Sequence, residues 1–228
     1  MNNTPITLRV KFKKVGQLQY ISHLDLVRTV HKIVVRSKLP LWYTEGFNPK
    51  PKLVFAAPLS VGTESLTEFL DIRLSERISP KDAMRMLNAN MTDEMQVLAA
   101  YYPETKPTDL KWFSYELSID TVGADDALAQ RINSALSNDR IEVIKKSKKG
   151  EVLADIKPLI KTATATFADG VIRLFCILSA DSSSFLNPEY LIKYLKGECG
   201  ILSSEALLTE GYSVMRISAY REDMSEFL

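Results

Sequence analysis

The clearest structural signal starts at residue 8 and reads LRVKFKKVGQLQYISHLDLVRTVHKIVVRSK, ending at residue 38. Residues 8–12 alternate apolar and basic side chains, which predicts a half-buried strand with its basic residues on one face. Ser22 is a favourable N-cap, and Asp25 three residues later makes a variant of the capping box. The following helix is expected to reach about Lys38, because Pro40 cannot continue it.

The rest of the chain completes this first run of strands and helices and then repeats a similar run. Further elements of the first run are expected as strands at 53–57, 68–74 and 95–101 and a helix at 81–90. Strand, helix, strands, helix, strand is the split βαβ order of ferredoxin-like domains. A similar run follows the proline-flanked linker at 103–107. We therefore expect an α+β protein with tandem ferredoxin-like domains and antiparallel sheets, at residues 1–104 and 108–228.

Charge is unevenly distributed along the chain, although its net value is only +1. Residues 1–60 hold ten lysines and arginines against two acids, Asp25 and Glu45, whereas residues 61–228 hold 19 bases and 26 acids. A basic quarter is typical of a surface for an anionic partner. A solvated face balanced by acids elsewhere in the fold explains it equally well.

Composition excludes several other classes. Cys176 and Cys199 are too few for a disulfide framework, and we expect both to be reduced, with Cys176 buried in the apolar run 172–178. No apolar run approaches the ~18 residues of a membrane span, and no signal peptide opens the chain. We expect a cytoplasmic protein without membrane contact. No metal-ligand cluster or phosphate-cradling glycine loop is evident, so neither a metal nor a cofactor is expected.

Three blocks of sequence resemble a known bacterial family. They are RVKFKKVGQLQYISHLDLVR at 9–28, LPLWYTEGFNPKP at 39–51 and PLSVGTESLTEFLDIRL at 58–74, with a weaker block, DIKPLI, at 155–160. Together they are similar to the radical-SAM-linked proteins, which occur beside a radical SAM enzyme or fused to its C-terminus. A radical SAM enzyme needs three closely spaced cysteines for its [4Fe–4S] cluster, and this chain has two in all. The resemblance therefore implies the separate partner of such an enzyme.

The first candidate site is the start of the helix at residue 22. Ser22, His23, Arg28 and Lys32 could bind a phosphate there, because a helix N-terminus carries unpaired N–H groups and partial positive charge. His23 could also act as a general acid or base. The second histidine, His31, lies two helical turns away, about 12 Å, which leaves His23 without a catalytic partner. The simpler interpretation is a capped helix in which Arg28 pairs with Asp25.

The second candidate site is the loop at 46–52, whose two prolines restrict its backbone. Phe47 among Asn48, Lys50 and Lys52 suits stacking on an unpaired base with phosphate contacts beside it. Trp42 and Tyr43, just upstream, could extend the platform. The alternative is that Phe47 and Trp42 anchor the core and the prolines only shape a turn.

Two other charged groups are interpreted as structural. Glu64, Glu68 and Asp71 form an acidic set, and we expect Glu68 and Asp71 to pair with Arg28 or Arg73. The lysine run at 145–149 is expected to be a solvated hairpin tip, with a secondary RNA contact as the alternative.

These features leave three hypotheses. The favoured one is an accessory module that binds RNA or presents a substrate to a separate radical SAM enzyme. The second is a protein-interaction subunit that docks this enzyme without nucleic acid. The third is a metal-independent RNA-processing enzyme that uses His23, disfavoured because no second catalytic group is evident.

Overall fold

The computed structural model describes residues 4–147, 150–203 and 209–228. It is a mixed α+β structure with mostly antiparallel strands and four α-helices in the described part of the chain. The chain forms two compact units, residues 1–110 with 226–228 and residues 111–225. The last three residues thus return to unit 1 after the chain has built unit 2.

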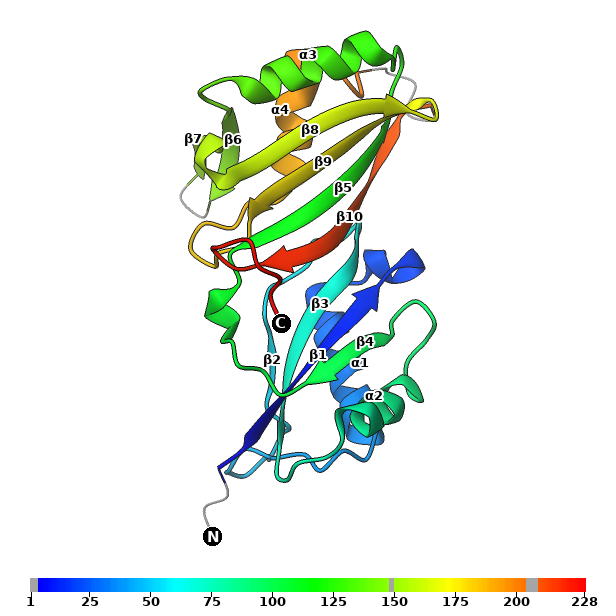
Figure 1. Cartoon of the computed structure of the whole chain (residues 1–228), viewed down its shortest axis with the longest axis vertical. Coiled ribbons are helices and arrows are strands. Elements are labelled where there is room, and N and C mark those ends of the chain that lie inside the picture. Colours follow the sequence, from blue (N-terminus) through cyan, green and yellow to red (C-terminus); the bar gives the residue numbers. More distant parts are fainter. Residues whose placement is uncertain (1–3, 148–149, 204–208) are drawn as a thin grey trace. The chain divides into compact units, whose positions relative to one another are not determined.

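Unit 1 is a four-stranded antiparallel sheet with two helices on one face (Figure 1). Its elements are β1 (Ile6–Lys14), a 3-10 helix (Gly16–Tyr20), α1 (His23–Arg36), β2 (Leu53–Phe55), β3 (Thr63–Leu74), α2 (Pro80–Asn88) and β4 (Val97–Tyr101). The strands lie in the order β4-β1-β3-β2. Each strand therefore runs opposite to its neighbours.

The alternation in β1 separates two faces of this sheet. Leu8, Val10 and Phe12 are fully buried in the core that α1 and α2 cover. Arg9 and Lys11 point to the opposite face, as expected. Arg9 is nevertheless also fully buried, so this part of β1 is enclosed on both faces and the expectation of a half-buried strand was wrong there.

Helix α1 begins as the sequence predicts and ends slightly earlier. Ser22 is the N-cap, which confirms the predicted start. The helix ends at Arg36, with Ser37 as C-cap. Lys38 adopts a left-handed backbone conformation with φ of 61°. This conformation stops the helix two residues before the predicted end.

Unit 2 contains a second four-stranded antiparallel sheet and a separate two-stranded ribbon. Its elements are β5 (Trp112–Asp120), α3 (Asp126–Ser137), β6 (Glu142–Ser147), β7 (Gly150–Asp155), β8 (Ile160–Ala168), β9 (Val171–Ser179), α4 (Glu189–Cys199) and β10 (Gly211–Tyr220). The sheet has the order β10-β5-β9-β8, and β6 pairs with β7 alone. Cys176 on β9 is buried, which raises its thiol pKa, and both cysteines are free.

The DIKPLI block is a structural joint in unit 2. Within the block β7 ends at Asp155, and a 3-10 turn, Lys157–Leu159, precedes β8. The Asp155 carboxylate accepts hydrogen bonds from the backbone N–H groups of Ile141 and Lys157, both at 3.0 Å. The Lys157 ammonium donates to the carbonyl of Leu136 in the last turn of α3 at 2.7 Å. The block thus joins the ribbon to α3 and β8.

Candidate nucleic-acid interface

The start of α1 is a closed set of polar contacts. Ser22 Oγ accepts the backbone N–H of Asp25 at 3.1 Å and donates to the Asp25 carboxylate at 2.7 Å. Arg28 donates to the same carboxylate at 3.3 Å. The hydrogen bond from Ser22, with a smaller contribution from Arg28, lowers the pKa of Asp25. This confirms the predicted cap and the predicted Asp25–Arg28 pair.

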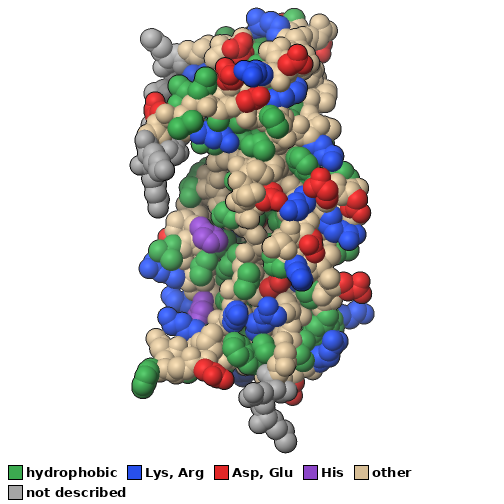
Figure 2. All heavy atoms as spheres, turned by 90° about the vertical axis from the view of Figure 1, so that its left-hand side faces the viewer, with side chains coloured by type: hydrophobic (Ala, Val, Ile, Leu, Met, Phe, Trp, Pro, Cys, Tyr) green, Lys and Arg blue, Asp and Glu red, His purple; other side chains and the backbone are tan. Residues whose placement is uncertain are grey.

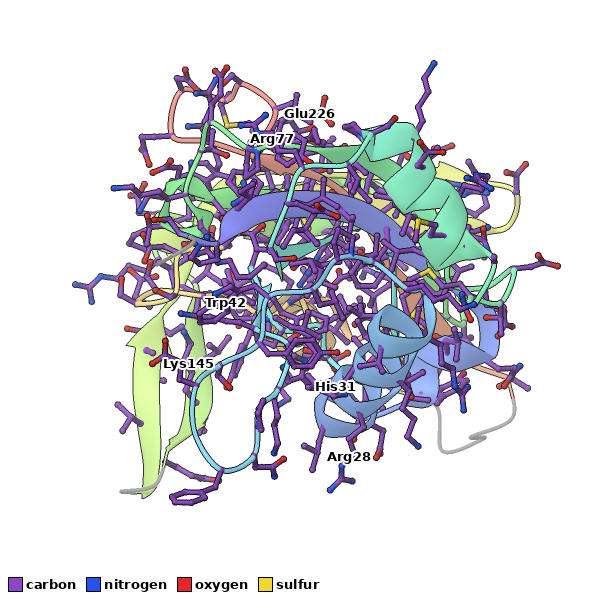
Figure 3. All side chains as sticks on the ribbon, turned by 90° about the horizontal axis from the view of Figure 1, so that it is seen from below. Arg28, His31, Trp42, Arg77, Lys145 and Glu226 are labelled. Atoms are coloured by element: carbon purple, nitrogen blue, oxygen red, sulfur yellow. The ribbon has the colours of Figure 1, made fainter. Side chains whose placement is uncertain are left out.

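The cap changes where an anion could bind. The Asp25 carboxylate already supplies negative charge at the helix N-terminus, so a phosphate at Ser22 would meet a like charge. Arg28 and Lys32 are exposed further along α1. Arg28 points outward from the helix, whereas His31 lies nearer the body of the unit (Figure 3). The basic stripe of α1 is therefore a better anion contact than its first turn.

His23 is exposed and packs edge-on against Phe55, with ring centroids 5.6 Å apart. Within the described residues, His23 has no hydrogen-bond partner, and the buried Nε2 of His31 has none either. Asp25, the nearest acid in sequence, is held by Ser22 and Arg28. The described part of the chain therefore offers no second group for catalysis at His23.

The loop between Tyr43 and Pro51 is pinned at its base. These two residues pair as an antiparallel bridge. Above the bridge, the Thr44 N–H donates to the Lys50 carbonyl at 3.0 Å, and the Lys50 N–H donates to Thr44 Oγ1 at 3.2 Å. One bridge and two hydrogen bonds thus fix the base of a loop only seven residues long, residues 44–50.

The apex of this loop presents an aromatic ring to solvent. Phe47 has a relative exposure of 112%, so no described residue covers its ring. Asn48, Lys50 and Lys52 are also exposed. Phe47 is therefore not a core anchor, whereas Trp42 is partly buried, as the alternative interpretation required.

Strand pairing shows how the two candidate sites are arranged. Phe55, which contacts His23, pairs with Leu70 of β3. The bridge at Tyr43 and Pro51 lies four residues before Phe55, about 13 Å along an extended chain. The loop with Phe47 projects beyond that bridge. Ser22 and His23 therefore lie at one end of α1 and the Phe47 loop lies toward the other.

Arg28 and Lys32 occupy the intermediate turns of α1. At 1.5 Å per residue they lie about 8 and 14 Å along the axis from His23, in the direction of the Phe47 loop. Figure 2 shows one face of unit 1 where both histidine side chains reach the surface among several lysine and arginine side chains. Arg28 is thus tied to the helix cap through Asp25, whereas Lys32 lies one turn further along α1, on the side of the Phe47 loop.

A buried charged cluster on the other face of the sheet was not anticipated. The Arg9 guanidinium donates two hydrogen bonds to Asp71, at 2.6 and 3.0 Å. Asp71 therefore does not pair with Arg28 or Arg73, as expected, but with Arg9. The ring of Phe227 covers the guanidinium at 4.8 Å. The alternation of apolar and basic residues in β1 gave no sign that one of the basic residues would be buried.

Relatives of the chain define its family. A family model described as "Uncharacterized protein conserved in bacteria (DUF2344)" matches residues 7–188. The chain belongs to this family. The match contains the four blocks quoted above, so the Phe47 loop and the α1 cap both lie within the DUF2344 region. The family description names neither RNA nor a radical SAM enzyme, and both stay predictions. No curated protein matches the chain.

Solved structures resemble the DUF2344 chain only in fold. A chain of a Cbf5-Nop10-Gar1 complex has a TM-score of 0.51 at 14% identity, over 95% of this chain and 50% of that one. The DUF2344 chain thus spans half the length of this neighbour. An unknown protein from Galdieria sulphuraria matches at 9% identity over 93% of this chain and 99% of that one, with a TM-score of 0.25. The second similarity is too low to support an argument.

The lysine run in unit 2 of the DUF2344 chain is partly described. It lies on the β6–β7 ribbon, and Lys148 and Lys149 fall outside the described residues. The Lys145 ammonium lies over the Tyr190 ring, 5.2 Å from its centroid. Ile144, Val152 and Leu153 on the same ribbon are more than half exposed. The ribbon is thus an apolar as well as a basic surface.

Metal-ligand clusters and membrane-spanning helices are both absent from the described residues. No group of three or more histidine, cysteine, aspartate or glutamate side chains there is arranged to hold a metal ion. Every described helix is too short or too polar to cross a membrane.

Proposed function

We propose that this DUF2344 protein is an accessory module that binds unpaired RNA through the Phe47 loop of unit 1. The fully exposed ring of Phe47 on a pinned loop carries the proposal, because an exposed aromatic ring beside cations is the combination on which unpaired bases stack. Lys50 and Lys52 flank it, and the α1 stripe adds Arg28 and Lys32. A base stacked on the ring with phosphates along the cations is the mode used for single strands.

The fold supports a finer proposal about both units. In unit 1 the strands in chain order 1 to 4 lie as 4-1-3-2, and in unit 2 the strands β5, β8, β9 and β10 repeat that order. We propose that both units are ferredoxin-like domains, with the β6–β7 ribbon inserted between the first helix and the second strand of the second domain.

The radical SAM partner enters the proposal through the sequence resemblance alone. A chain with two cysteines, one of them buried, cannot hold the cluster itself. We propose that it acts beside a separate radical SAM enzyme. Co-expression with a radical SAM enzyme from the same genome, followed by co-purification, tests this. Failure to co-purify at low salt would remove the partner and leave RNA binding untouched.

One observation favours the protein-docking alternative. Ile144 and Leu153 are directly paired across the β6–β7 ribbon and both are more than half exposed, which leaves an apolar spot that no described element covers. In that case Ile144→Ser would weaken enzyme binding, whereas Arg28→Ala and Lys52→Ala would not. The ribonuclease alternative has no supporting observation, because His23 has only the ring of Phe55 as a described contact.

Fluorescence anisotropy with a labelled single-stranded RNA tests the main proposal. Phe47→Ala should weaken binding five- to hundredfold, since stacking contributes about 1–3 kcal/mol per base. Phe175→Ala is a matched control, because Phe175 is also solvent-exposed but lies on β9 of unit 2. Equal affinity of wild type and Phe47→Ala would contradict the proposed site. A duplex of the same sequence should bind more weakly, because its bases are already stacked.

A further inference from the structure

We propose that the helix-free face of the unit 1 sheet is a docking groove for an extended protein segment in which an acidic residue precedes an aromatic one. In the structure, residues 226–228 of this chain occupy the groove, and we infer that a partner segment of the same chemistry can replace them. This inference is independent of the RNA proposal, which concerns the Phe47 loop.

The resident segment shows what the groove recognises. Lys11 pairs with the Glu226 carboxylate at 2.9 Å. Phe227 is fully buried, edge-on to Phe69 with centroids 5.0 Å apart and under the Arg9 guanidinium at 4.8 Å. The groove thus selects a negative charge and an aromatic ring in adjacent positions.

The third position is recognised through the backbone. The Leu228 carbonyl accepts hydrogen bonds from Arg9 Nη1 at 3.3 Å and from the Thr105 hydroxyl. The Leu228 side chain itself is 49% exposed. Any residue at this position would keep those backbone contacts, so specificity resides in the acidic and aromatic positions.

The groove is formed by unit 1 without help from the segment. Asp71 holds the Arg9 guanidinium with two hydrogen bonds, so the cation keeps its counterion when the segment leaves. Thr105 also binds Arg9 directly, at 2.7 Å. The walls that receive Phe227 are therefore fixed by contacts that an exchange of segments would not break.

The resident segment leaves one polar group of the groove unused. Tyr101 is the cross-strand neighbour of Arg9, and its buried hydroxyl has no hydrogen-bond partner in the described residues. A buried donor without an acceptor is costly. A partner segment that offers one more acceptor here would bind better than residues 226–228 do, which favours replacement in trans.

The test uses the full chain and a labelled peptide of residues 221–228, measured by fluorescence anisotropy. Weakening the internal segment with Phe227→Ala should open the groove. We expect this variant to bind the peptide at least tenfold more tightly than wild type, and a peptide with alanine in place of the phenylalanine not to bind. Phe175→Ala, which changes a phenylalanine outside the groove, should behave as wild type.

Two results would overturn the inference. One is a Phe227→Ala chain with native circular dichroism that binds no peptide. The other is equal binding of the native and alanine peptides. If Phe227→Ala does not fold, a charge exchange replaces it: Lys11→Glu should bind a peptide that carries lysine for Glu226 and reject the native one. Loss of this preference would refute the groove, and RNA binding should be unchanged in Phe227→Ala and Phe175→Ala.

Discussion

The contribution of an ion pair to stability depends on its burial, and the Arg9–Asp71 pair lies in the interior. Both residues are buried, so Asp71→Ala would leave a guanidinium in the interior without a counterion. We expect this change to lower the free energy of unfolding by about 3–5 kcal/mol, measured by urea denaturation. Asp25→Ala breaks an exposed pair of the same kind and should cost much less. Similar losses in the two variants would show that Arg9 has another adequate partner.

Two phenylalanines of unit 1 should differ strongly in their contribution to stability. Phe227 is fully buried, and Phe47 is fully exposed. Phe227→Ala should lower the free energy of unfolding by about 3–5 kcal/mol, because it leaves a cavity. Phe47→Ala should change it by less than about 0.5 kcal/mol. Thermal and urea unfolding of both variants check this, and a large loss at Phe47 would mean that the ring packs against the protein.

At the scale of elements, the DIKPLI joint predicts a pH dependence. Backbone hydrogen bonds from Ile141 and Lys157 lower the pKa of Asp155 in the folded chain. A carboxyl group with a depressed folded pKa stabilises the fold above its unfolded pKa, and this stabilisation is lost as the pH falls through the folded value. Asp155→Asn should therefore be less stable than wild type near pH 7, with the difference shrinking below about pH 4.

Unfolding midpoints of wild type and Asp155→Asn between pH 7 and pH 3 measure this effect. Val152→Ala, at an exposed position on the same strand, is the control, because it removes no ionisable group and its effect on stability should not depend on pH in this range. A difference that stays constant over the whole pH range would mean that the carboxylate charge does not hold the joint.

Local signals predicted the elements well, and distant pairings poorly. The Ser22 cap, the proline at the start of α2 and the alternation in β1 each depend on neighbouring residues, so the sequence alone locates them. The partner of Arg9 is 62 residues away, and the ring that covers it comes from Phe227. No periodicity indicates such a pairing. The break at Asp155 has no local signal either, because the Asp155 side chain binds the backbone of Ile141, 14 residues earlier.

At the candidate sites, too, local features could be predicted from the sequence and the arrangement of distant segments could not. Glycine and proline around Phe47 predicted a loop of fixed shape, and the structure places its ring in solvent. The sequence could not show that the helix cap and this loop lie toward opposite ends of α1, because their separation follows from the pairing of β2 with β3. The sequence therefore predicted two candidate sites without showing how they are arranged.

At the scale of the whole molecule, the basic excess belongs to the first 60 residues and not to unit 1 as a whole. Ten of the chain's 29 lysines and arginines and only two of its 28 acids precede residue 61. Residues 1–110 with 226–228 hold 15 bases against 12 acids, and residues 111–225 hold 14 against 16, so a basic surface on unit 1 is local to the exposed bases of the first segment, among them Arg28, Lys32, Lys50 and Lys52. This asymmetry, together with the exposed Phe47, is the basis of the RNA-binding proposal.

The most direct test is the affinity of the full chain for single-stranded RNA at two salt concentrations. Three or four phosphate contacts from Arg28, Lys32, Lys50 and Lys52 should give a slope of about −2 to −3 in log affinity against log salt. The Arg28→Ala/Lys52→Ala double variant should bind more weakly with a slope shallower by about 1.4. No binding by the wild-type chain at low salt would contradict the account and favour a subunit that docks a protein partner.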